Sequence, residues 1–156
     1  MNNKRRIFMH GGLAAGVVSV AVGAGLLTPR SVLAKWPSSS FEAESLDDAL
    51  KASMGGDQAT ESSDITVKAP DIAENGAVVP ITVSSTIKGV TTIAIYVKEN
   101  ARPMTASYDL GEGTEAFVSN RIKMGKTSDV VAVVKADGKL YQAKKAVKVT
   151  IGGCGG

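Results

Sequence analysis

The sequence predicts an all-β domain, an immunoglobulin-like antiparallel β-sandwich preceded by a short helix. Seven short runs rich in β-branched residues follow one another over residues 65–151, and regularly spaced short strands are typical of sandwiches. Turn sequences separate several runs, most clearly Asp137-Gly138, a pair typical of a type I′ hairpin. Alternate residues such as Val130, Ala132 and Val134 are apolar, as are Ala143, Val147, Val149 and Ile151, which is the period of a β-strand.

A single helix is predicted before the strands. A Pro/Ser-rich spacer covers residues 36–40, and apolar residues then recur at roughly helical spacing from Phe41 to Met54, where Gly55-Gly56 ends the helix. The polar stretch 57–64 is a predicted loop. The seven predicted strands are Ile65–Ala69, Val78–Ser84, Thr91–Lys98, Met104–Leu110, Glu115–Met124, Asp129–Ala136 and Lys139–Ile151.

The run Asp129–Val134 is apolar on both faces of its predicted strand. Such a run is typical of a strand that is covered on both sides. The outer face of a small sandwich normally meets water, so the second cover is either another part of this chain or a partner subunit. Periodicity alone does not separate these two interpretations, and both stay open.

Composition excludes several classes of function. The 156 residues include 18 Lys and Arg against 15 Asp and Glu, a formal net charge of +3. Four of those basic residues and no acidic residue lie within residues 1–34, which leaves 14 basic and 15 acidic residues, a net −1, in the remainder. A basic nucleic-acid-binding surface is therefore not supported.

The inventory of ligating and nucleophilic residues is equally restrictive. His10 is the only histidine and Cys154 the only cysteine. After residue 34 the chain therefore cannot build a His-based catalytic triad, a His-ligated haem, an internal disulfide, or a Cys-based zinc or iron–sulfur site. No glycine-rich phosphate-binding motif is present. We predict no bound cofactor.

Residues 1–34 are predicted to be an export signal that is cleaved after Ala34. The run Lys4-Arg5-Arg6-Ile7-Phe8-Met9 is similar to the twin-arginine signal, with Arg5, Arg6 and Phe8 as the recognition residues. An ordinary secretory signal is the alternative. We expect export to the periplasm by the twin-arginine pathway. Because that pathway moves folded proteins and no cofactor is predicted, one hypothesis is that this chain carries a leaderless partner with it.

The candidate functional residue is Cys154, which follows the last predicted strand. The three residues from Ile151 to Cys154 span roughly 10 Å at full extension, enough to deliver a sulfur atom into a narrow cleft of another protein. Glycine gives backbone freedom, so residues 152–156 are predicted to form a flexible arm. The flanking residues are Gly152, Gly153, Gly155 and Gly156.

An unpaired cysteine in an exported protein has three interpretations: an intermolecular disulfide, a dispensable residue, or a thiol that covalently holds a substrate. The glycines favour the third, because a structural cross-link gains from rigidity. Lys144, Lys145 and Lys148 are candidates for attracting an anionic adduct, although charges on an edge strand are more often a solvated face. No histidine lies nearby to activate the thiol. We therefore predict a carrier on which partner enzymes act, and not an enzyme.

Four stretches together resemble the SoxY family, the carrier subunits of the bacterial sulfur-oxidising (Sox) system. The terminal Gly-Gly-Cys-Gly-Gly motif is the specific part of this resemblance, and with the twin-arginine leader the likeness covers nearly the whole chain. The stretches are Gly152–Gly156 after Val147–Ile151, Ala69–Pro80, Arg121–Met124 and Ala136–Tyr141.

The resemblance implies a heterodimer with SoxZ, a leaderless immunoglobulin-like subunit. It further implies that a c-type haem enzyme joins thiosulfate to Cys154 as a cysteine S-thiosulfonate. A manganese-dependent hydrolase then releases sulfate, and a sulfane dehydrogenase or sulfur storage handles the remaining sulfur. Cys154 is the attachment point throughout, and the four glycines give it access to successive active sites.

Two other functions stay open. A ubiquitin-like sulfur carrier also ends in Gly-Gly and would place the chemistry on Gly156, although such carriers are cytosolic β-grasp folds. A structural exported sandwich would dimerise through Cys154. The expected organisation is a leader over 1–34, a spacer and helix over 35–63, a sandwich over 64–151 and an arm over 152–156.

Overall fold

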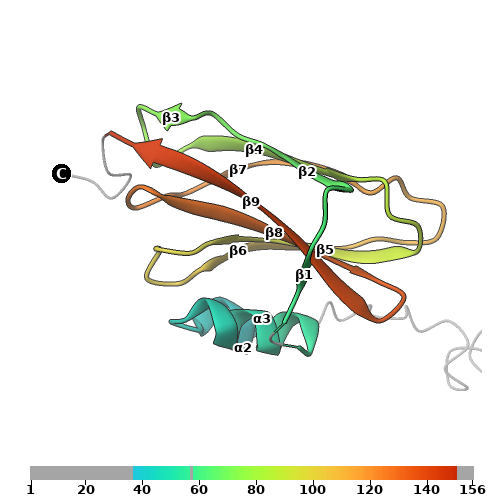
Figure 1. Cartoon of the computed structure of the whole chain (residues 1–156). Helices are drawn as coiled ribbons and strands as arrows, with labels where there is room; N and C mark the ends of the chain where they lie inside the picture. The colour runs from blue at the N-terminus through green and yellow to red at the C-terminus, as the bar shows by residue number, and fades with distance from the viewer. Residues whose placement is uncertain (1–36, 57, 151–156) are drawn as a thin grey trace, which may run out of the picture. The chain divides into compact units, whose positions relative to one another are not determined.

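The computed structural model describes residues 37–56 and 58–150, which form the predicted immunoglobulin-like β-sandwich (Figure 1). The larger sheet has the order β1-β9-β8-β5-β6, with β3 also paired to β9, and the smaller sheet has the order β2-β4-β7. The strands are β1 (Thr60–Glu61), β2 (Ile65–Lys68), β3 (Ile72–Ala73), β4 (Val79–Ser85), β5 (Val90–Val97), β6 (Met104–Asp109), β7 (Phe117–Ile122), β8 (Ser128–Ala136) and β9 (Lys139–Val149).

All seven predicted strands are present as β2 and β4 to β9, with ends that differ by a few residues. The short strands β1 and β3 were not predicted, because two residues are too few to show a period. Both pair with β9 in parallel, whereas the pairs among the other strands are antiparallel. The sandwich is therefore antiparallel except at one edge of its larger sheet.

The predicted hairpin turn between β8 and β9 is confirmed. Asp137 has φ 49° and Gly138 has φ 74°, and a type I′ turn requires positive φ at both central residues. This turn fixes the register, in which Ala136 faces Lys139 and Ser128 faces Val147.

The predicted single helix over 41–54 is wrong in its extent, because two helices occupy this region: α2 (Ser38–Glu42) and α3 (Leu46–Met54). The chain is extended at Ser45, whose hydroxyl accepts a hydrogen bond from the Asp48 N–H and so caps a new helix. Gly55 ends α3, as predicted, and adopts the left-handed conformation with φ 78°.

The main core lies between the two sheets and is aliphatic. Val130, Ala132 and Val134 of β8 point into this core and are fully buried. Their partners come from both sheets, and include Ile81 and Val83 of β4 and Ile93, Ile95 and Val97 of β5.

The other face of the larger sheet is covered by α3. Leu50 and Met54 pack there against Tyr96, Val131 and Val133, and the last two are only 2% and 1% exposed. The structure thus decides between the two covers considered for the run 129–134, since this chain buries both faces of β8 by itself. The hypothesis that a partner covers that strand is wrong.

A polar contact also ties α3 to the sheet. The hydroxyls of Ser53 and Tyr96 lie 2.5 Å apart, and Ser53 also donates to the Ala49 carbonyl at 2.7 Å. Burial raises the pKa of the Tyr96 phenol, and the hydrogen bond with Ser53 opposes that rise in part. Neither α2 nor α3, the helices of the described part, is long and apolar enough to cross a bilayer.

Candidate functional site

The candidate site is the end of the sandwich at which β9 stops, because Cys154 follows that strand. Thr150 is the last described residue, so Cys154 and the four glycines around it lie outside the described residues. The leader residues Arg5, Arg6, Phe8 and Ala34 also lie outside them. The described part therefore shows the base from which residues 151–156 continue.

Hydrogen bonds hold the end of β9 from two sides. On one side β3 runs parallel to it, so that the Lys148 N–H donates to the Asp71 carbonyl at 2.9 Å and the Thr150 N–H donates to the Ala73 carbonyl at 3.1 Å. On the other side the Val149 N–H donates to the Thr127 hydroxyl at 3.0 Å. The chain is thus anchored up to Thr150, four residues before Cys154.

Three connections meet at this end of the sandwich, which we call the exit end: residues 69–78, 98–103 and 123–127. Asn100 joins two of them, since its side-chain N–H donates to the Lys123 carbonyl at 2.8 Å and its side-chain oxygen accepts from the Gly125 N–H at 2.9 Å. The Met124 N–H donates to the Gly76 carbonyl at 2.7 Å and joins the third. The exit end is therefore a connected surface.

A groove of about 870 Å³ lies between the β5–β6 and β7–β8 connections of the exit end. Four cationic side chains line it against two acidic ones, Glu44 and Glu99. One cation is paired, since Lys126 lies 3.5 Å from Glu99. The other three are exposed and form no ion pair with another described residue; they are Lys98, Arg102 and Lys123.

The lysines of β9 that were candidates for attracting an anionic adduct are mostly engaged elsewhere. Lys144 lies 3.0 Å from Glu61, and Lys145 is paired with Asp71. The hydrogen bond from Lys145, and then its charge, lower the pKa of the Asp71 carboxyl. Only Lys148 of the three forms no ion pair with a described residue.

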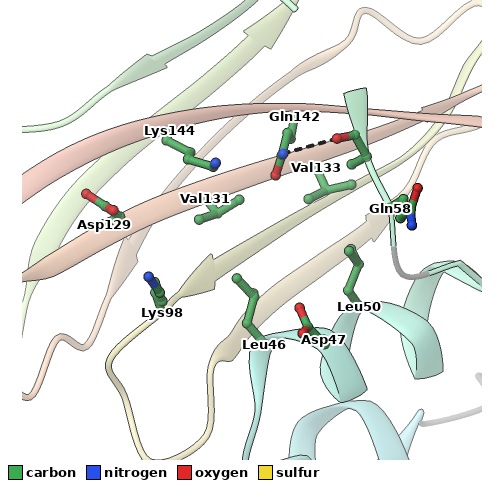
Figure 2. A pocket seen from close by; sticks show the side chains of 11 residues that line it. Leu46, Asp47, Leu50, Gln58, Lys98, Asp129, Val131, Val133, Gln142 and Lys144 are labelled. Atoms are coloured by element: carbon green, nitrogen blue, oxygen red, sulfur yellow. Dashed lines mark hydrogen bonds between the residues drawn. The ribbon is translucent and has the colours of Figure 1, made fainter. Parts of the chain in front are cut away.

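A second pocket, of about 440 Å³, lies beside α3 on the outer face of the larger sheet (Figure 2). Leu46, Leu50, Val131 and Val133 form its apolar part, and the Gln142 side chain is oriented by donating to the Ala59 carbonyl at 3.1 Å. Its lining contains no serine, cysteine or histidine. Among the described residues, no cluster of His, Cys, Asp and Glu suited to a metal ion occurs either.

Sequence reasoning missed the cations of the exit-end groove. Lys98 and Arg102 are separated from Lys123 by more than 20 positions, and only the pairing of β5 with β6 and β8 brings their loops together. No local pattern marks them. The signal that could have found them is the predicted strand order, because alternate connections of an antiparallel sandwich fall at the same end.

The chain matches the family model described as "Sulfur oxidation protein SoxY" over residues 50–154, a range that includes Cys154. Among solved structures, it is similar to the sulfur carrier protein SoxY from Chlorobium limicola f thiosulfatophilum. That match has 50% sequence identity and a TM-score of 0.62, and covers 68% of this chain and 96% of that one.

A second structural likeness is more distant. The superoxide reductase (neelaredoxin) from Ignicoccus hospitalis matches with 21% identity and a TM-score of 0.49, over 55% of this chain and 78% of that one. Among curated proteins, none matches the chain.

Proposed function

Because the chain belongs to the SoxY family of sulfur oxidation proteins, we propose that it is a periplasmic carrier that holds sulfur intermediates covalently on Cys154 and presents them to partner enzymes. The single observation that carries this proposal is that the family match extends to Cys154. The anchoring of β9 up to Thr150 supports it, because the thiol then follows a fixed base by only four residues.

The first step joins thiosulfate to the thiol. The Cys154 thiol loses its proton. A bond forms between the Cys154 sulfur and the outer sulfur of thiosulfate, and two electrons pass to a c-type haem enzyme. The product is a cysteine S-thiosulfonate. This oxidation requires the partner's haem, because the carrier contributes the nucleophilic sulfur alone.

The second step is hydrolytic. Water attacks the sulfonate sulfur at a manganese-dependent hydrolase, the S–S bond to that sulfur breaks, and sulfate leaves with release of protons. A cysteine persulfide stays on Cys154. A sulfane dehydrogenase then oxidises the outer sulfur with oxygen from water and takes up the electrons, which leaves a cysteine S-sulfonate, and a second hydrolysis releases sulfate and restores the thiol. In the other branch, sulfur storage takes up the outer sulfur directly and the thiol is left.

We also propose that the chain works as a heterodimer with a SoxZ subunit and that the twin-arginine leader exports both. Family membership supports the partner. The apolar face of β8 no longer does, since α3 covers it. Replacement of Arg5 and Arg6 by lysine is expected to retain both subunits in the cytoplasm, as followed by fractionation, whereas periplasmic SoxZ in that strain would contradict the joint export.

Intact mass spectrometry tests the carrier function. The complex is incubated with thiosulfate and the haem enzyme, and we expect an adduct of one thiosulfate that a reductant removes and that Cys154→Ala abolishes. An adduct that survives Cys154→Ala, or one located on Gly156, would favour a thiocarboxylate carrier. A doubled mass before treatment, with no adduct afterwards, would favour a structural dimer.

A further inference from the structure

The two ends of the sandwich differ in charge. The exit end together with the last five residues of β9 has six basic and three acidic residues, a net +3. The opposite end is formed by the connections 62–64, 86–89, 110–116 and 137–138, and together with the first five residues of β9 it has two basic and four acidic residues, a net −2. The positive end is the one from which the chain continues toward Cys154.

Exposed apolar side chains show the same asymmetry. Among the described residues, three large hydrophobic side chains are exposed, and two of them, Ile72 at 56% and Val78 at 52%, lie in the 69–78 connection of the exit end. A surface with exposed apolar side chains beside unpaired cations is typical of a protein interface, in which apolar contacts bind and charges steer.

Chain length restricts what can contact Cys154. Cys154 is the fourth residue after Thr150, and four residue steps span about 14 Å at full extension. Any enzyme whose active site receives this sulfur must therefore approach the exit end within that distance. The groove is adjacent, since Thr127 of its β7–β8 connection contacts Val149.

We propose that the exit-end groove, with Lys98, Arg102 and Lys123, is a docking surface for the acidic rim around the active-site entrance of the enzymes that act on Cys154. The proposal rests on the carrier function. Its physical basis is charge complementarity: the three cations have no ion pair with a described residue and are available to a partner's carboxylates. Asn100 fixes both walls of the groove, so the cations are presented on a prearranged surface.

Such docking raises the rate of encounter more than the rate of chemistry. Charge steering accelerates association by factors of about 10 to 1000 and weakens steeply as salt is added. The exit end meets the enzyme first because the opposite end is repelled by the same acidic rim. Successive enzymes can share this surface, since weak, fast-exchanging contacts are sufficient for a short visit.

The test uses the processed carrier with its partner subunit and the haem enzyme that joins thiosulfate to the thiol. Arg102→Glu/Lys123→Glu reverses two groove cations, and Lys88→Glu/Lys139→Glu is the matched control, because it makes the same change in net charge at the opposite end. We expect the groove variant to raise KM for the carrier about tenfold at low ionic strength with kcat unchanged, and to lose most of its salt dependence.

The control is expected to stay within about twofold of the wild-type KM. Equal effects in both variants, or no effect in the groove variant, would overturn the proposal. Arg102→Gln/Lys123→Gln removes the two charges without reversing them and is expected to give an intermediate KM. It keeps the proposal testable if the charge-reversed variant does not fold. A changed rate of adduct reduction by a small thiol with an unchanged KM would mean that the groove holds the adduct, and would also overturn docking.

Failure of docking and failure of the carrier function give different results in this assay. Cys154→Ser removes the thiol and leaves the groove intact. If Cys154→Ser abolishes conjugation while the groove variant behaves like wild type, docking is wrong and the carrier function stands. If Cys154→Ser still forms the conjugate, the carrier function itself is wrong.

Discussion

The hydroxyl of Thr127 accepts a hydrogen bond from the backbone N–H of Val149 at 3.0 Å and lies 3.4 Å from the Val149 carbonyl oxygen. One side chain of the β7–β8 connection thereby ties down the last residue of β9. The same connection carries Lys123 and Lys126 of the groove. The groove and the base of the Cys154 segment are thus parts of one hydrogen-bonded unit.

Thr127→Val keeps the shape of this side chain and removes its hydroxyl. We expect a loss of about 1 kcal/mol in the free energy of unfolding, because the Val149 N–H loses its partner. Amide hydrogen exchange at Val149 should accelerate in native conditions. Thr91→Val, which removes a hydroxyl bonded to the Lys135 carbonyl at the opposite end, is the control and should leave exchange at Val149 unchanged; equal acceleration in both variants would contradict the local anchor.

Two serines near α3 predict opposite effects of the same substitution. Ser40 is fully buried, and its hydroxyl has no hydrogen-bond partner among the described residues. Ser40→Ala removes an unsatisfied polar group and should raise the free energy of unfolding by about 1 kcal/mol. Ser53→Ala deprives the buried Tyr96 hydroxyl of its partner and should lower the same quantity by about 1–2 kcal/mol. Denaturant titration measures the free energy of unfolding of both variants. Changes of the same sign in the two variants would contradict this prediction.

Tyr96 predicts a loss of stability in alkaline solution. Its pKa is raised in the folded state, mainly by burial, so the unfolded chain releases the phenol proton first, near its free value of about 10. Above that pH the unfolded state binds fewer protons than the folded state, and stability falls as pH rises. In Tyr96→Phe the free energy of unfolding should fall less steeply than in the wild type between neutral and strongly alkaline pH. A wild-type slope in Tyr96→Phe would contradict this origin of the alkaline loss.

The contact between Asp71 and Lys145 is expected to be lost in acid. Lys145 lowers the pKa of this carboxyl below its ordinary value of 3.8, first by a hydrogen bond and then by its charge. The stabilising contact is complete above the ordinary value and disappears as pH falls through the lowered one. Lys145→Gln should therefore raise the pKa of Asp71 as measured by carboxyl-carbon NMR. Lys148→Gln, three strand positions away, should leave it unchanged, and an equal rise would mean that general charge and not the Lys145 contact sets the pKa.

The sandwich was predictable because its signals are local. The apolar run of β8 and the Asp137-Gly138 turn are properties of a few neighbouring residues, and the strand and the turn are both confirmed. The helix break at 43–45 was missed, since apolar spacing on either side of Ser45 continues at the same period and hides the cap. The covering of Val131 and Val133 by α3 depends on tertiary packing. The apolar pattern of a strand does not show which element covers it.

The candidate site divides in the same way. Cys154 and its glycines form a short motif that can be identified in a single sequence, and they lie outside the described residues. The groove is built from loops that are distant in sequence, and each of its cations alone is an ordinary surface residue. Strand pairing brings these loops to the same end. The side chain of Asn100 then bonds across two of them and gives no sign of that role in the sequence.

The way β9 is flanked restricts how other proteins can bind near its end. Strand β1 occupies the outer edge at Tyr141 and Gln142, and β3 occupies it at Lys148 and Val149. Between them only residues 143–147 of this edge have no strand partner. An incoming peptide can therefore not pair along the whole edge as an extra strand, a mode of binding that gives tight and long-lived complexes. Partners that bind here rely more on side-chain contacts, whose quick release is what the proposed carrier function requires.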